Sequence, residues 1–98
     1  MSFYAVEYSY SPSTAEPRAN QRPEHLAWLQ EHEKAGNLLA SGRYATDSGA
    51  LLIWKAQDES ALRGLLDQDP YAHSQLIHAL RIEEWLPTLG PFDSSGSA

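Results

Sequence analysis

The sequence has no cysteine, so the chain forms neither disulfides nor thiolate metal sites. It also has no apolar run close to the roughly 20 residues that a helix needs to cross a bilayer. Its beginning lacks the basic segment and apolar stretch of a secretory signal. We therefore expect a cytoplasmic protein without a membrane partner.

Basic residues are also few: seven Lys and Arg residues stand against thirteen Asp and Glu, for a net charge of −6. Proteins that bind nucleic acid cluster Lys and Arg to neutralise phosphates. The scattered cations here predict no nucleic-acid partner, and the acidity favours solubility. The 98 residues predict one domain, over residues 1–92, followed by a flexible polar tail over residues 93–98.

Hydrophobic periodicity predicts four strands and two helices. The aromatic start of the chain alternates with a period of two, which is typical of a strand. Residues 11–22 hold two prolines and many small polar side chains, and predict a loop. Pro23 favours the first turn of a helix that Gly36 ends, and Asp58 favours the N-cap of a second. The predicted elements are a strand over residues 3–10, a helix over 23–35, strands over 38–44 and 50–56, a helix over 58–67, a helical turn over 72–74 and a strand over 75–85.

This order, strand-helix-strand-strand-helix-strand, predicts an α+β fold with a four-stranded antiparallel sheet and both helices on one face. The other face would then be bare, and Phe3, Trp54 and Trp85 are the aromatic residues expected on it. An uncovered apolar sheet face is typical of an interface. We therefore expect a homodimer through this face, with assembly to a higher oligomer left open.

No metal or phosphate site is predicted. His32 and Glu33 begin the pattern of a zinc protease, but Gly36 stands where that pattern needs its second histidine. His25 and His32 are separated by about 10 Å along a helix, which is too far for one metal ion. The chain also lacks a glycine-rich phosphate loop and a serine elbow. We expect no metal and no cofactor.

His25 is the main candidate for chemistry. In the predicted helix it lies in the first turn, where the positive end of the helix dipole favours neutral imidazole, the form that accepts a proton. Alternatively, His25 only fills space and forms a single hydrogen bond. Asp69 and Pro70 form an ordinary helix-ending pair, yet the topology brings the end of the second helix near the start of the first. Asp69 would then orient the imidazole and raise its basicity, as the carboxylate does in a catalytic triad.

An ordered set of short motifs resembles the YCII (YciI-like) family of small ferredoxin-like α+β proteins. The motifs are Phe3-Tyr4-Ala5-Val6, Arg22-Pro23-Glu24-His25-Leu26, Gly36-Asn37-Leu38-Leu39-Ala40-Ser41-Gly42 and Asp69-Pro70-Tyr71. The resemblance implies a dimer whose sheets pack face to face and a cleft around a paired histidine and aspartate, which map to His25 and Asp69. Most members have no assigned reaction, and one family activity is dehydrochlorination of a chlorinated hydroxyhydroquinone. Residues 11–22 and 85–91 depart from the family pattern, which leaves the substrate open.

We therefore expect a small-molecule enzyme of the lyase, isomerase or hydrolase type, in which His25 is the general acid/base and Asp69 orients it. The residues expected to bind substrate are Arg22 and Arg43 for an anionic or phenolic oxygen, Ser41 and the Gly42 backbone as hydrogen-bond donors, and Tyr71 and Trp54 as an aromatic wall. Two alternatives stay open. One is a non-catalytic module that binds a metabolite in the same cleft, and the other is a structural dimer whose polar pair is a satisfied buried network.

Overall fold

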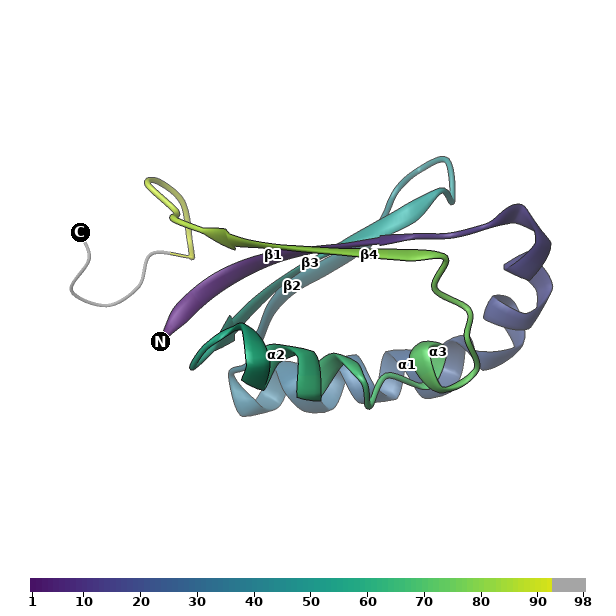
Figure 1. Ribbon diagram of the computed structural model, residues 1–98, viewed down its shortest axis with the longest axis horizontal. Coiled ribbons are helices and arrows are strands. Elements are labelled where there is room, and N and C mark those ends of the chain that lie inside the picture. The colour runs from purple at the N-terminus through teal and green to yellow at the C-terminus, as the bar shows by residue number, and fades with distance from the viewer. Residues whose placement is uncertain (93–98) are drawn as a thin grey trace.

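Residues 1–92, the part of the chain that the computed structural model describes, form one antiparallel sheet with helices on a single face (Figure 1). The strands are β1 (Ser2–Ser9), β2 (Leu38–Arg43), β3 (Gly49–Ala56) and β4 (Ala79–Trp85), in the spatial order β2-β3-β1-β4. The helices are the 3-10 helix η1 (Pro12–Thr14) and the α-helices α1 (Ala15–Ala35), α2 (Glu59–Leu66) and α3 (Pro70–His73). The predicted α+β, ferredoxin-like sheet is confirmed.

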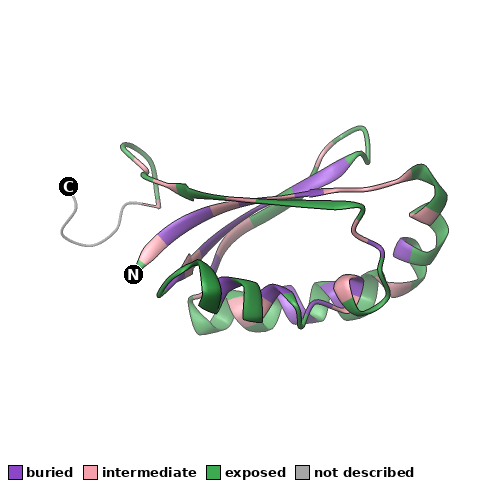
Figure 2. Cartoon of the chain, viewed as in Figure 1, coloured by how far each residue is buried: buried purple, intermediate pink, exposed green. Residues whose placement is uncertain are grey.

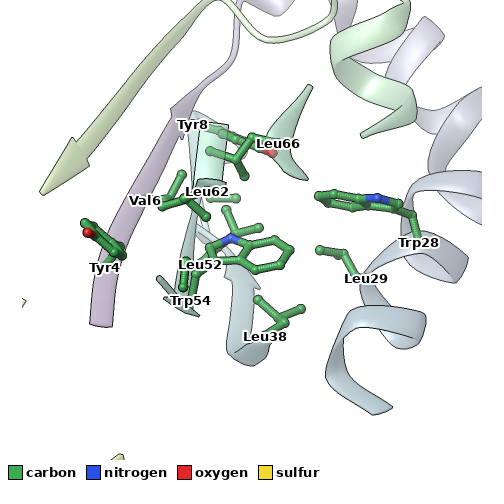
Figure 3. Close-up of a cluster of buried hydrophobic side chains, with 12 residues drawn as sticks. Tyr4, Val6, Tyr8, Trp28, Leu29, Leu38, Leu52, Trp54, Leu62 and Leu66 are labelled. Atoms are coloured by element: carbon green, nitrogen blue, oxygen red, sulfur yellow. The ribbon is translucent and has the colours of Figure 1, made fainter. Parts of the chain in front are cut away.

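The core lies between the sheet and α1 and α2, as the burial pattern of Figure 2 shows. In β1, Tyr4, Val6 and Tyr8 all face the helices, because successive side chains of a strand point to opposite faces. The helices cover them with apolar side chains, which Figure 3 shows converging on the sheet. These helix residues are Trp28 and Leu29 of α1 and Leu62 and Leu66 of α2.

Trp54 of β3 is part of this core, and its expected place on the bare face is wrong. It pairs with Tyr4 across the β1–β3 ladder, so both rings share the helix-covered face. Phe3 and Trp85 do lie opposite each other on the β1–β4 ladder and share the uncovered face. Charged residues share this face, since Phe3 also pairs with Lys55.

Helix α1 is eight residues longer at its beginning than predicted, because residues 15–22 are helical. Pro23 therefore lies inside the helix, where it withholds one backbone N–H from the ladder. Arg18 explains the longer helix. This residue is only 5% exposed. Its guanidinium donates to the Ser11 carbonyl oxygen at 2.8 Å and forms an ion pair with Asp47 at 3.1 Å. These contacts outside the helix hold its first turns in place.

Strand β4 begins at Ala79, four residues later than predicted. Gln75 has a φ of 57°, a left-handed conformation that interrupts an extended strand. Residues 93–98, predicted as a flexible tail, lie outside the described part of the chain. Among the described helices, none combines the length and the hydropathy that a membrane crossing requires.

Candidate active site

One face of α1 carries four of the side chains that line a cavity. Arg18, Arg22, His25 and Leu29 are spaced by four, three and four residues, so they share one side of the helix. All four line a cavity of about 240 Å³ between α1 and the end of β2. The first two were placed in a loop by the sequence analysis, so this stripe becomes visible only with the longer helix.

Behind the cavity, the buried carboxylate of Asp69 receives three hydrogen bonds. Its residue is the N-cap of α3, and Oδ1 accepts from the Tyr71 backbone N–H at 2.9 Å. Oδ1 also lies 2.7 Å from Nδ1 of His25, and Oδ2 accepts from the Tyr8 hydroxyl at 2.8 Å. A carboxylate only accepts, so Nδ1 carries the hydrogen in this contact. The Asp69 side chain is fully buried, and these donors replace its lost hydration.

The imidazole of His25 is held in a fixed orientation. It stacks on the Tyr71 ring, with 3.9 Å between the ring centroids and 4° between the planes. The Trp28 ring also lies near it, with the ring centroids 6.4 Å apart. Within residues 1–92, the buried side-chain nitrogens without a partner are Trp28 Nε1 and Trp54 Nε1. His25 lines the cavity, and its Nε2 has no hydrogen-bond partner among the described residues.

The tyrosines around the site keep their protons. Burial raises the pKa of Tyr8 far above its ordinary value, and the charge and hydrogen bond of Asp69 raise it further. Burial also raises the pKa of Tyr10 and of Tyr71, although Arg22 and Arg18 oppose the rise at Tyr71. These hydroxyls therefore serve as hydrogen-bond donors.

His25 does not lie where the sequence analysis placed it on the helix. It occupies the middle of α1, so the positive end of the helix dipole is remote and the expected effect on the imidazole is wrong. Its partner Asp69 comes from the start of α3, which packs against α1 (Figure 1). The contact of 2.7 Å with Asp69 fixes the orientation of the imidazole.

The other predicted site residues divide into two groups. Five of them line the cavity with His25, namely Arg22, Ser41, Gly42, Arg43 and Tyr71. Trp54 does not line it, so its predicted role as a cavity wall is corrected. Its ring is fully buried in the core against Trp28, with the ring centroids 5.4 Å apart.

Four further residues were missed by the sequence analysis: Tyr8, Tyr10, Arg18 and Asp47. Tyr10 lies under the Arg18 guanidinium, whose carbon is 4.3 Å from the ring centroid, and both line the cavity. Arg18 is seven residues before His25, a helical spacing that would have revealed it had the helix been extended. Within the described residues, no three His, Asp or Glu side chains cluster as metal ligands would.

Comparisons with known proteins agree with this architecture. The model of the YCII-related domain family matches residues 2–86. A 5-chloro-2-hydroxyhydroquinone dehydrochlorinase from Burkholderia phenoliruptrix, solved with 2,5-dihydroxybenzoquinone, superposes with a TM-score of 0.77 at 19% identity, covering 86% of this chain and 93% of that one. A NIPSNAP domain protein from Burkholderia xenovorans superposes with a TM-score of 0.55 at 13% identity, covering 95% of this chain and 100% of that one. None of the curated proteins compared with the chain matches its sequence.

Proposed function

Because the chain belongs to the YCII-related family, as its motifs predicted, we propose that it is a small-molecule enzyme in which His25 is the general acid/base. The observation that carries the proposal is the contact of 2.7 Å between Asp69 Oδ1 and His25 Nδ1, in a histidine that lines the cavity and whose Nε2 has no described partner. This is the arrangement that a base needs: a fixed ring, one nitrogen occupied by a carboxylate and the other without a partner.

The proposed chemistry is proton transfer. Nε2 takes a proton from a C–H or O–H bond of the substrate, and the bonding electron pair stays on the substrate. That pair either expels a leaving group from the neighbouring atom, which is elimination, or is protonated elsewhere by the same imidazolium, which is isomerisation. Asp69 stabilises the imidazolium in both cases. The dehydrochlorinase with the same fold carries out a reaction of the first type by its name, which supports this class for the present chain.

Substrate contacts are proposed for the remaining cavity residues. Arg22 and Arg43 would hold an oxyanion, while the Ser41 hydroxyl and the Gly42 backbone N–H would donate hydrogen bonds. The Tyr71 ring would form the wall beside the imidazole, on which it already stacks. No described nucleophile is activated by a neighbouring base, so covalent catalysis is not part of the proposal.

The test is a turnover screen of small phenols and hydroxyquinones, including 5-chloro-2-hydroxyhydroquinone, with wild type and His25→Ala. We expect His25→Ala to lower turnover by about 10²–10⁴-fold, the usual contribution of a positioned acid/base. His32→Ala is the control, because His32 is a second α1 histidine that does not line the cavity. Wild-type turnover in His25→Ala contradicts the proposal. If ligands raise the melting temperature of wild type but none is turned over, the protein is a non-catalytic binding module and not an enzyme.

A homodimer through the uncovered sheet face is also part of the proposal, as is a cytoplasmic location. Leu51 is 40% exposed and lies on that face beside Glu7, its partner on β1. We expect Leu51→Glu to shift the protein toward monomer in sedimentation equilibrium, because a charge there is desolvated on association. Leu80→Glu is the matched control, since Leu80 is 42% exposed but pairs with Tyr8 on the opposite face. A wild type that is monomeric at micromolar concentration contradicts the dimer.

A further inference from the structure

The charge of the cavity is opposite in sign to the charge of the protein. The chain has seven Lys and Arg residues and a net charge of −6. Three of those seven line this one cavity: Arg18, Arg22 and Arg43. Asp47 is the single acidic residue among the described lining residues, and its carboxylate is already paired with Arg18 at 3.1 Å. The cavity therefore keeps an excess of positive charge in an acidic protein.

The three arginines are not equivalent. Arg18 is buried, and its guanidinium already donates to Ser11, to Thr14 and to Asp47. It connects the start of α1 to the turn after β2. Because most of its N–H groups are already used, Arg18 contributes positive charge to the cavity but few hydrogen-bond donors to a ligand. Arg22 and Arg43 are exposed and form no ion pair with any residue in the range 1–92. Arg22 also lies close enough to the Tyr71 hydroxyl to hydrogen-bond with it, so the donors open to a ligand are its remaining N–H groups and those of Arg43.

The unpaired arginines come from two different elements. Arg22 is on α1, three residues before His25, and Arg43 is the last residue of β2. The positive charge of Arg22 reaches the Tyr71 hydroxyl, where it opposes the rise of that pKa. Tyr71 stacks on His25, so the Tyr71 ring links the Arg22 side of the cavity to the imidazole. A ligand whose anionic group is bound by Arg22 would therefore have its reacting group near His25.

Size and wall chemistry restrict the ligand further. The cavity of about 240 Å³ is smaller than the roughly 300–1,000 Å³ that drug-sized ligands occupy. Its walls include the rings of Tyr10 and Tyr71 and the side chain of Leu29. Planar guanidinium groups match the two oxygens of a carboxylate, and aromatic walls match a flat ring. A polyanion is disfavoured, because it would meet the negative surface of the rest of the protein.

From these observations we infer that the substrate is a small one-ring carboxylate, bound through its carboxylate by Arg22 and Arg43 with the ring against Tyr71 and His25. The inference rests on the proposed function in assigning the cavity to the substrate. It adds a carboxylate as the ligand class, which differs from the hydroxyquinone bound in the related dehydrochlorinase structure. Binding of the carboxylate does not require proton transfer, so the two claims are separable by experiment.

The experiment is isothermal titration of benzoate and of benzamide, a neutral molecule of similar shape, into wild type, Arg22→Gln, Arg43→Gln and Arg63→Gln. We expect benzoate to bind roughly tenfold or more tightly than benzamide, because hydrogen bonds to a charged group are the stronger ones. Arg22→Gln and Arg43→Gln should each remove most of this preference, because the charge that favours benzoate over benzamide is lost. Arg63→Gln is the matched control, since Arg63 is exposed on α2 and paired with Glu59.

Equal affinities for benzoate and benzamide, or no binding of either, overturn the inference, as does an equal loss in Arg63→Gln. His25→Asn separates it from the proposed function. Benzoate preference that survives in His25→Asn while turnover is lost supports both claims. A wild type that turns over neutral phenols but shows no benzoate preference overturns only the ligand class. A benzoate preference in a protein whose turnover does not depend on His25 overturns only the catalytic role.

Discussion

Replacing Asp69 by alanine is expected to lower the free energy of unfolding by about 3–5 kcal/mol, because a buried hydrogen-bond acceptor shared by three donors is lost. These three donors are the Tyr8 hydroxyl, the His25 Nδ1–H and the Tyr71 backbone N–H. Each buried donor left without a partner costs about 1–3 kcal/mol. Urea denaturation followed by circular dichroism measures the loss directly.

Two further variants show which part of the Asp69 network matters. Asp69→Asn keeps the shape and an oxygen acceptor, so we expect a much smaller loss of stability than in Asp69→Ala. Turnover should nevertheless fall strongly, because the imidazolium loses its charged partner. Tyr8→Phe removes one of the three donors and should cost about 1 kcal/mol. An Asp69→Ala protein as stable as Tyr8→Phe contradicts the network, since it would mean that the carboxylate contributes only one bond.

The part of the site that the sequence revealed is the part with local signals. Asp69 and Pro70 form a helix boundary that is recognisable from two residues, and Gly36 ends α1 with a φ of 86° as expected of a C-cap glycine. The period-two alternation at the start of the chain also indicated strand β1. These features depend on residues that are close in the sequence, and the order of strands and helices follows from them.

The features that the sequence did not reveal depend on contacts between distant residues. Tyr8 and Asp69 are separated by 61 positions, and no local sequence pattern in either segment predicts the hydrogen bond between them. Arg18 holds the start of α1 through Asp47, 29 positions away. The proline at 23 favoured a helix start by its local preference, and these tertiary contacts outweigh that preference. The error at the helix start then concealed the stripe of cavity residues before His25.

Trp54→Ala is expected to be as destabilising as Asp69→Ala, for a different reason. Trp54 is fully buried, and its ring lies 5.4 Å from the rings of both Trp28 and His32. Truncating a buried tryptophan to alanine costs about 3–5 kcal/mol, through lost burial and the void that remains. Trp54→Phe should cost only about 1–2 kcal/mol, because the loss of volume is partly offset by removing Nε1–H, a buried donor without a described partner.

The same pair of variants decides whether Trp54 belongs to the core or to the cavity wall. A core residue that does not touch the ligand changes stability and leaves affinity alone, so Trp54→Phe should bind benzoate within about twofold of wild type, a difference below 0.5 kcal/mol. Tyr71→Leu is the matched control, because Tyr71 is also a buried aromatic residue but lines the cavity and stacks on His25. Its benzoate affinity should fall, since the flat wall beside the imidazole is lost. If Trp54→Phe weakens benzoate as much as Tyr71→Leu does, Trp54 reaches the ligand and its original assignment to the wall is restored.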